Sequence, residues 1–508
     1  MHHDEHNEAR EAPAHGPNSS RANVLSFVLL VTAGFFLARL PVLAHQFFDP
    51  DEFEHAHAAW CVFKGMIPYK DFFEHHTPFY YYALSPFFHW FPVDLSFDSA
   101  RHFLTFARGL SLVLALLSVF LVVLLGRLLT DRRLGVWAGF FLVAQPFFFE
   151  KTTEIRPDVL ALPFFLGSLC FLLYGLARSR DAAKGSLWHF FGGGLCLGAA
   201  IMCTQKMLFV LPGLLTGLSI WSLFSSFHGG INVGRVSRIL ATVTFLVGLG
   251  VLVSLTWAAF ALHHGGGQFI TNNFLLNSKW KHVSHEQLLR LLETSWPALI
   301  LCLLGASASM VRFLRSEQAQ YGGVLLLSTL TGLIVGVLVV PGAHRQYYLI
   351  LLPIISLFAA EGLFVLVDCA QSGIRSWLLV FALILLSVLP ALDLRDAFAS
   401  RNDSQLARLH YVFESTKPTD LVMDGIEGTG VFRPHALYHY FLHAELLDML
   451  SRQQVDAYMV ALESGKISPK LIALDENLVA LGTRFLRFVK RNYVSNDGFF
   501  YFSKRASD

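Results

Sequence analysis

Carboxylates that could accept a proton follow the first long apolar run of the chain. The segment Asp49-Pro50-Asp51-Glu52-Phe53-Glu54 comes directly after the apolar run 24–44. A second acidic set, Glu154 and Asp158, stands between two later apolar runs. A positioned carboxylate can take the proton from an attacking hydroxyl group, so these residues are candidates for a general base.

Three single cations, Arg156, Lys206 and Arg345, each stand at the end of an apolar run where Lys and Arg are otherwise uncommon. Ionisable residues at membrane depth are costly and usually have a partner or a function. Each side chain could instead reach lipid phosphates without a specific ligand. Because the three come from different hairpins but share one side, we favour a bound anionic headgroup, whose departing phosphate such cations could stabilise.

The chain that must position these groups has the composition of a membrane protein. Of its 508 residues, 54% are hydrophobic and only 15% are charged, whereas soluble domains carry roughly 25% charged residues. Several apolar runs approach or reach the roughly 20 residues needed to cross a hydrocarbon core, and together they predict about eleven transmembrane helices. These lie near residues 24–44, 107–127, 134–150, 158–177, 187–203, 207–225, 239–262, 294–311, 322–341, 346–367 and 376–392.

Lys and Arg gather in alternate loops between these runs, which sets the orientation by the positive-inside rule. The cytoplasmic loops then hold Arg127, Arg132, Arg133, Arg178, Arg180, Lys184, Arg235, Arg238, Arg312, Arg315 and Arg375. With the N-terminus inside, an odd number of helices puts the C-terminal segment outside, together with loops 45–106 and 263–293. The acidic sets and the three exceptional cations therefore converge on the external face.

The chain divides into three predicted parts. Residues 1–22 are polar without apolar periodicity and predict a disordered cytoplasmic tail. Residues 23–393 form the transmembrane module, including the aromatic-rich external loop 45–106, which we expect on the membrane surface. Residues 394–508 predict a small external domain of α/β or α+β class. The predicted fold is therefore an all-α polytopic membrane protein with a small C-terminal soluble domain.

The first external loop opens with Asp51-Glu52, which is followed by the segment from Gly65 to Asp71, with Pro68-Tyr69 inside it, and by Thr77-Pro78. With this combination the loop resembles the GT-C superfamily of membrane glycosyltransferases, near bacterial relatives of protein O-mannosyltransferases and of the aminoarabinose transferase that modifies lipid A. Weaker support comes from Arg156-Pro157-Asp158, from Lys206 before an apolar helix, and from Arg345-Gln346-Tyr347-Tyr348-Leu349.

The resemblance implies roles for individual residues. Asp51 would be the catalytic base, with Glu52 and Asp158 in the catalytic set and shaping the acceptor or sugar site. Lys206 and Arg345, together with Arg156 and His344, would hold the lipid-linked phosphate. The remaining predicted acceptor or sugar site residues are Glu154, Tyr69, Asp71, His75 and His76.

The resemblance also implies an activity: inverting transfer of a hexose or pentose from a polyprenyl-phosphate sugar to a lipid, glycan or protein acceptor. The expected place is the periplasmic face of a bacterial inner membrane, among membrane lipids. A protein acceptor is not favoured, because no β-trefoil insert is recognisable. No cofactor is required, and a divalent metal is not favoured because His55, His57, His75 and His76 lack a fixed zinc-site spacing. His435, His439 and His443 recur every four residues, which would align them on one face of a helix, where they could hold a metal or sense pH. We favour the interpretation as an ordinary interfacial stripe.

Other classes of function compete with this interpretation. A transporter or flippase for an anionic lipid-linked substrate would also be polytopic, but its site would usually lie near the midplane between repeated halves. An assembly or receptor protein could use the external loop and domain for docking. Nucleic-acid binding is excluded, because the net charge is only +2 and the basic residues are dispersed. Cys61 has no obvious partner in its own loop.

Overall fold

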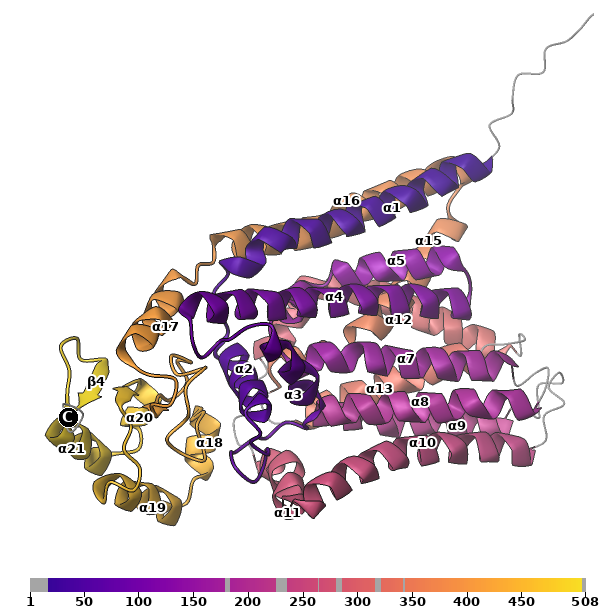
Figure 1. The fold of residues 1–508 in the computed structure, drawn as a ribbon. Helices are drawn as coiled ribbons and strands as arrows, with labels where there is room; N and C mark the ends of the chain where they lie inside the picture. Colours follow the sequence, from indigo (N-terminus) through magenta and orange to yellow (C-terminus); the bar gives the residue numbers. More distant parts are fainter. Residues whose placement is uncertain are drawn as a thin grey trace, which may run out of the picture.

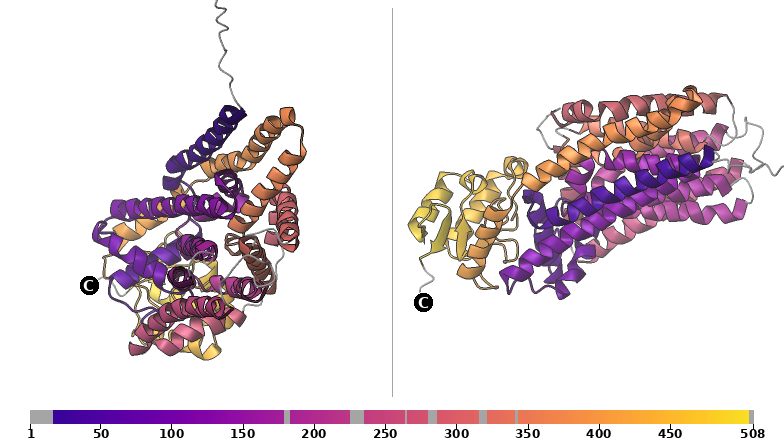
Figure 2. Two further views of the ribbon diagram at one scale, coloured as in Figure 1. Left: turned by 90° about the vertical axis from the view of Figure 1, so that its right-hand side faces the viewer. Right: turned by 90° about the horizontal axis from the view of Figure 1, so that it is seen from above.

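The fold is a bundle of long helices with a smaller domain at one end (Figure 1). The structure, a computed structural model, describes residues 17–178, 183–224, 235–263, 265–279, 286–315, 321–340 and 343–504. The views in Figure 2 show the same arrangement, with the C-terminal domain projecting beyond one end of the bundle. Most of the predicted tail 1–22 lies outside the described residues, and the first helix begins at Pro17.

Within the described part of the chain, nine helical segments are long and apolar enough to cross a membrane. They are α1 (Pro17–Arg39) continued by η1 (Leu40–Ala44), α4 (Phe97–Leu129), α7 (Pro157–Arg178), η3 (Gln205–Phe209) with α9 (Val210–Phe224), α10 (Arg235–Leu262), α12 (Glu286–Leu314), α13 (Tyr321–Val339), α15 (Leu352–Cys369) and α16 (Ser372–Ala399). A further apolar helix, α8 (Ala183–Cys203), has a shorter apolar part. The predicted all-α polytopic fold is confirmed.

The third predicted helix, 134–150, is divided into α5 (Arg132–Val143) and α6 (Pro146–Thr152). Pro146 stands at the first position of α6, where its missing N–H costs nothing, whereas inside a continuous helix it would remove a hydrogen bond and clash with the carbonyl group four residues earlier. Lys151 on α6 and Arg156 shortly after it both contact Asp49 of the first external loop. The charged residues at and after α6 therefore lie at the same end of the bundle as that loop.

Glycine permits close contact between α8 and α10. A side chain on Gly194 would place its Cβ 2.0 Å from the Phe245 carbonyl oxygen, and one on Gly248 would place it 2.3 Å from that of Phe191. Both distances are far below van der Waals contact, so these two helices approach backbone to backbone. This agrees with the expectation that Gly192-Gly193-Gly194 serves helix packing, as small residues do in membranes.

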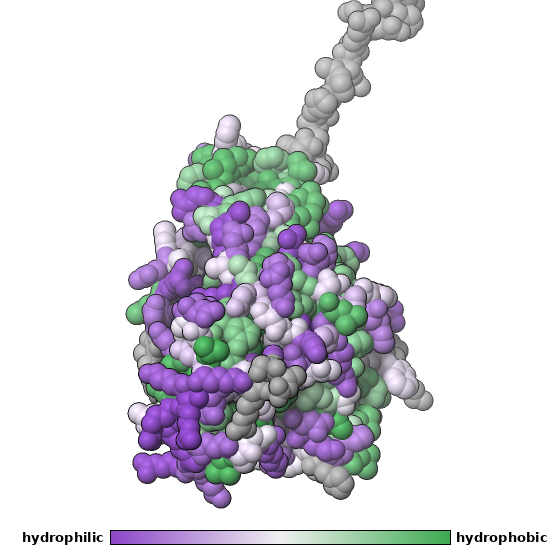
Figure 3. All heavy atoms as spheres, turned by 60° about the vertical axis from the view of Figure 1, so that its left-hand side comes forward, coloured by the Kyte–Doolittle hydropathy of each residue, from purple (hydrophilic) through white to green (hydrophobic). Residues whose placement is uncertain are grey.

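The bundle carries an apolar outer surface. Leu30, Leu37 and Phe381 are each more than 60% exposed on α1 and α16. Figure 3 shows hydrophobic surface at the top, where these helices lie, and a largely hydrophilic face over the C-terminal domain. Exposed apolar side chains of this density on long helices indicate contact with lipid. The chain is therefore an integral membrane protein.

Short helices from the external loop lie between the bundle and the C-terminal domain: α2 (Pro50–Phe63), α3 (Phe79–Leu84) and η2 (Ser85–His89). The first turn of α2 is fixed by a capping box, in which Asp49 accepts the Asp51 N–H and Glu52 accepts the Asp49 N–H. Residues 52–61 of α2 are all buried. The helix that bears Asp51 is therefore held firmly on all sides.

The C-terminal domain contains a four-stranded sheet in the order β1-β2-β4-β3. Strand β1 (Val422–Met423) is parallel to β2 (Leu471–Ala473), whereas β4 (Phe500–Ser503) is antiparallel to both β2 and β3 (Tyr493–Val494). The helices are α17 (Asp403–Ser415), α18 (Ala444–Met449), α19 (Arg452–Glu463), α20 (Glu476–Val479) and α21 (Thr483–Asn492). The predicted mixture of strands and helices is confirmed.

Candidate active site

A polar cavity of about 430 Å³ lies at the end of the bundle next to the C-terminal domain. Its walls come from α2, α6, η3, the short helix α14 (Arg345–Tyr348) and loops of the C-terminal domain. The lining residues are Asp49, Asp51, Glu54, His75, His76, Glu150, Lys151, Arg156, Gln205, Lys206, Asn277, Gln287, His344, Arg345, Gln346, Tyr347, Phe441, His443 and Glu445. The predicted base and all four predicted phosphate-binding residues thus share one cavity.

Asp51 forms part of the acidic wall. Its Oδ2 lies 2.8 Å from Nη2 of Arg156, and its side chain is 35% exposed to the cavity. Burial alone would raise the pKa of Asp51, but the Arg156 guanidinium outweighs it, with smaller contributions from His55, His76 and Lys151, and holds this pKa well below its usual range. Asp51 is therefore an ionised carboxylate at neutral pH and can accept a proton.

Glu54 is a second carboxylate on this wall, three residues after Asp51 and thus on the same face of α2. Burial raises the pKa of Glu54 well above its usual value, and the neighbouring Glu74 and Asp51 carboxylates raise it further. The two carboxylates are thereby driven toward opposite protonation states. Glu54 belongs to the acidic segment predicted from the sequence but was given no separate role there, although its spacing from Asp51 was a usable signal.

The cationic wall is built from separate elements. Lys206, at the start of η3, lies 3.0 Å from both carboxylate oxygens of Asp158 and 4.7 Å from the centre of the Tyr347 ring. Arg345 binds Glu150 at 2.5 Å and is 26% exposed, so part of its guanidinium faces the cavity. Burial lowers the pKa of His344, which makes it a neutral hydrogen-bonding group at neutral pH.

Lys151 is a further cation of this cavity, and it was not among the residues predicted from the sequence. Its ammonium lies 2.8 Å from Glu154 and 3.4 Å from Asp49 and lines the cavity. It stands in the last turn of α6, two residues after Phe149, so a cation close to the end of an apolar run was a usable signal, as it was for Arg156. The C-terminal domain contributes His443 and Glu445, 3.0 Å apart. His443 belongs to the four-residue histidine pattern that we interpreted as an interfacial stripe, but residues 435–443 form no helix and His443 lines the cavity.

Three predicted catalytic or sugar-site residues lie behind the cavity wall instead of on it. Glu52 is fully buried and receives Nη2 and Nε of Arg108 at 2.6 and 2.8 Å and the Ile155 N–H at 3.1 Å. Asp158 is buried against Lys206, and Glu154 against Lys151 and Arg156. Their contacts support an indirect role, in which they orient residues that line the cavity; direct participation stays a prediction.

Tyr69 and Asp71 lie in the turn before the histidine pair, away from the cavity lining. Tyr69 adopts a positive φ of 69°, and its hydroxyl donates to the His76 carbonyl at 2.7 Å. Asp71 is exposed and accepts the Ile67 N–H at 2.7 Å. The segment that resembles the GT-C loop therefore fixes the backbone that carries His75 and His76, both of which line the cavity.

The histidine pair belongs to a buried group of possible metal ligands, Glu54, Glu74, His75 and His76, whose ligand atoms lie within 4.8 Å of one another. His76 Nδ1 lies 3.1 Å from Glu74 Oε1, and His75 Nδ1 lies 3.5 Å from Glu54 Oε1. Carboxylate and imidazole ligands suit Mn²⁺ or Zn²⁺. The expectation that no metal is required stays a prediction.

Comparison with known proteins agrees with this architecture. The family described as dolichyl-phosphate-mannose-protein mannosyltransferase matches residues 85–257. No curated protein sequence matches the chain.

Among solved structures, ArnT from Cupriavidus metallidurans in the apo state has a TM-score of 0.65 and 13% identity, covering 96% of this chain and 98% of that chain. The same protein bound to undecaprenyl phosphate has a TM-score of 0.62 and 12% identity, with the same coverage of both chains. The archaeal oligosaccharyltransferase AglB from Archaeoglobus fulgidus, in complex with an inhibitory peptide and a dolichol-phosphate, gives 0.58 and 12%, covering 95% and 75%. At these identities the shared property is the fold.

Proposed function

We propose that this chain, which has the GT-C fold of membrane glycosyltransferases, transfers a sugar from a polyprenyl-phosphate donor to a hydroxyl group of an acceptor. The observation that carries the proposal is that an ionised Asp51 and the cations Lys206, Arg345 and Arg156 line one cavity. A base and a phosphate-binding surface are the two parts that glycosyl transfer requires. The acceptor class extends over lipid, glycan and protein, and the sugar over hexoses and pentoses.

The proposed mechanism is a single inverting displacement. Asp51 takes the proton from the acceptor hydroxyl as its oxygen attacks the anomeric carbon in line. The bond from that carbon to the phosphate oxygen breaks, and the lipid phosphate leaves with the electron pair. Lys206 and Arg345 stabilise the negative charge that grows on the departing oxygen, which is where fixed cations contribute most to the rate.

The lipid-linked nature of the donor is supported by the solved relatives, one bound to undecaprenyl phosphate and one to a dolichol-phosphate. We further propose that the cavity faces the periplasm of a bacterial inner membrane. This orientation is supported by Arg132, Arg178, Arg312 and Arg375, which stand at helix ends remote from the C-terminal domain.

The test is reconstitution of the full-length protein in vesicles with a radiolabelled polyprenyl-phosphate sugar and a lipid extract that supplies acceptors. The proposal predicts release of free polyprenyl phosphate together with labelled acceptor. If label moves between leaflets with the donor bond intact, the protein is a transporter and the proposal is wrong. If neither release of polyprenyl phosphate nor movement of label occurs in vesicles shown to bind polyprenyl phosphate, the proposed glycosyl transfer is also contradicted.

Arg345→Ala is expected to weaken donor binding by about 10- to 150-fold, because a hydrogen bond to a charged group contributes roughly 1.5–3 kcal/mol. KM for the donor and competition by polyprenyl phosphate measure the effect. Arg345→Lys, which keeps the charge, should recover part of the lost donor affinity. Arg375→Ala, at the opposite end of the bundle, should leave donor affinity unchanged. Equal affinities in Arg345→Ala and the native protein would exclude phosphate binding by this residue.

Arg156→Gln is expected to shift the acid limb of the kcat/KM profile toward higher pH. Arg156 is the main cause of the lowered pKa of Asp51, so its removal raises that pKa. Since the base is active only when ionised, activity falls as pH drops through the pKa of Asp51, and a raised pKa brings this loss to a higher pH. An unchanged acid limb would show that another group sets it.

A further inference from the structure

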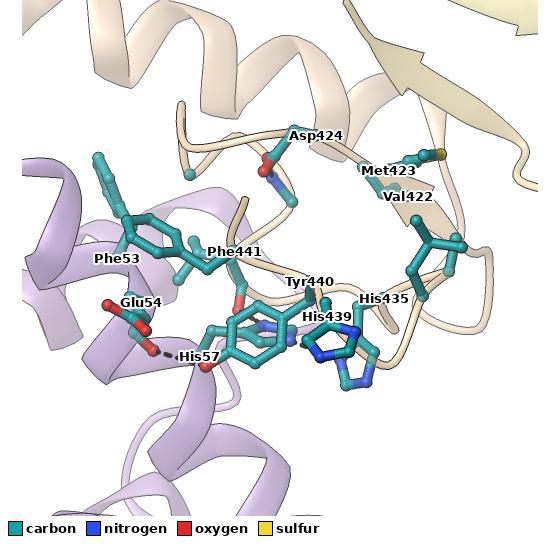
Figure 4. Close-up of a pocket in the computed structure, with 15 residues that line it drawn as sticks. Phe53, Glu54, His57, Val422, Met423, Asp424, His435, His439, Tyr440 and Phe441 are labelled. Atoms are coloured by element: carbon teal, nitrogen blue, oxygen red, sulfur yellow. Dashed lines mark hydrogen bonds between the residues drawn. The ribbon is translucent and has the colours of Figure 1, made fainter. Parts of the chain in front are cut away.

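A second group of potential ligands lies outside the active-site cavity, where α2 meets the C-terminal domain. His57 Nε2 is 2.8 Å from His435 Nδ1, and Cys61 Sγ is 3.4 Å from the former and 3.8 Å from the latter. Figure 4 shows His57 on α2 and His435 on the facing segment of the C-terminal domain, with Tyr440 beside them. Residues far apart in sequence thus bring three ligand atoms to one point.

The orientation of His57 is fixed by its other ring nitrogen. Nδ1 lies 2.8 Å from the Val431 carbonyl oxygen, which can only accept, so Nδ1 carries the proton. The lone pair of Nε2 therefore points toward Cys61 and His435. Histidines that bind metals usually donate their second N–H in this way, most often to a carbonyl or a carboxylate. Cys61 follows His57 by one helical turn and projects from the same face of α2.

Burial also suits coordination. His57 is 4% exposed and Cys61 is 0% exposed, so bulk water does not compete for these ligand atoms. A bound cation would displace the proton of the Cys61 thiol, because the thiolate is the ligand form.

We propose that His57, Cys61 and His435 bind one Zn²⁺-class cation through Nε2, Sγ and Nδ1. Tetrahedral Zn²⁺ with nitrogen at about 2.0–2.1 Å and sulfur at about 2.3 Å separates its ligand atoms by roughly 3.3–3.6 Å. The observed separations of 2.8, 3.4 and 3.8 Å bracket this range, so only small side-chain movements are needed.

We assign the fourth ligand position to a water molecule. A cavity of about 40 Å³ borders His57 and His435, between Phe53 and Tyr440 of the same interface. One water needs roughly 10–15 Å³ of such space, so the cavity holds it without rearrangement. The donor set of two imidazoles and a thiolate favours Zn²⁺ over Mg²⁺ or Ca²⁺, which prefer oxygen ligands.

The proposed site differs in position and consequence from the catalytic cavity. It joins α2, whose first turn carries Asp51, to a segment of the C-terminal domain. A cation bound only in the folded state stabilises that state by mass action, so it would fasten the domain to the helix. The proposal does not depend on the proposed glycosyl transfer.

Cobalt substitution of the full-length detergent-purified protein tests the site. After removal of bound metal by a chelator, Co²⁺ should produce thiolate-to-cobalt charge-transfer absorption and tetrahedral d–d bands, both displaced by Zn²⁺. Cys61→Ser should lose the charge-transfer band, and His435→Gln should lose or strongly weaken it. The band identifies this site, because the Glu54, Glu74, His75 and His76 group contains no thiol.

Controls separate coordination from damage to the fold. Cys369→Ser removes an exposed cysteine, and His410→Asn removes a half-exposed histidine of the C-terminal domain; both should keep the band. Cys61→His retains a ligand and should bind Co²⁺ with native stoichiometry but without thiolate absorption. Absence of the band in the native protein, or its persistence in Cys61→Ser, would overturn the proposal.

Discussion

Asp51→Asn is expected to lower kcat/KM by about 10²- to 10⁴-fold, the range for removal of a general base. The amide keeps the shape of the side chain but cannot take the acceptor proton. The Asp51 N–H that donates to the capping side chain of Asp49 belongs to the backbone and is retained, so the helix should still form. Release of polyprenyl phosphate from the labelled donor in vesicles measures the rate, and donor binding should change much less than turnover.

Two neighbouring carboxylates supply controls for this experiment. Asp49 lies 3.1 Å from the same guanidinium of Arg156 and caps α2. Since Asn caps helices about as well as Asp, Asp49→Asn removes one charge from Arg156 with a smaller expected loss of activity. Glu54→Gln asks whether the second carboxylate on the wall is the base instead. Full activity of Asp51→Asn would refute its role.

The fold could be predicted largely from the sequence because a bilayer restricts the choice of structure. Backbone polar groups in lipid must form hydrogen bonds within a helix, so each long apolar run could be predicted as a transmembrane helix. The resemblance to the GT-C superfamily, carried by Asp51-Glu52 and the segment ending at Asp71, is confirmed at the level of the fold. The division at Pro146 was not predicted, since the apolar run continues through it.

The site was partly predictable for a similar reason. Arg156, Lys206 and Arg345 stood out because they violate a charge rule that applies along the whole chain, and all three line the cavity. The carboxylates that pair with these cations were not predictable, because ion pairs depend on how distant segments meet. His443 lines the cavity from the C-terminal domain, to which the positive-inside rule does not apply, so its place in the site could not be predicted in this way.

The position of Glu52 behind the cavity wall shows the same limit of prediction from sequence. Asp51 and Glu52 form one acidic pair in the sequence, and the resemblance to the GT-C superfamily assigned both to the site. Successive residues on a helix point about 100° apart, so the pair cannot face the cavity together. Glu52 instead joins α2 to Arg108 on α4 and to the backbone of Ile155. It therefore connects three segments that shape the cavity.

Glu52→Ala is expected to destabilise the protein by about 3–5 kcal/mol, because it leaves Arg108 buried without its counterion. The ion pair is almost completely excluded from solvent, with side chains 0% and 3% exposed. Thermal unfolding in detergent, followed by loss of monodispersity, measures the change. Lys64 and Asp94 form an exposed pair at 2.7 Å, and Asp94→Ala should cost only about 0–1 kcal/mol.

The double variant Glu52→Ala/Arg108→Met then distinguishes an ion pair from a catalytic group. Removing both charges avoids an unpaired buried cation and should restore much of the lost stability. Recovery will be incomplete, because Arg108 also donates to the carbonyls of Leu43, Gln46 and Phe47. If activity per folded molecule returns with stability, Glu52 acts through the position of α2. Restored stability without activity would instead assign the Glu52 carboxylate to the chemistry.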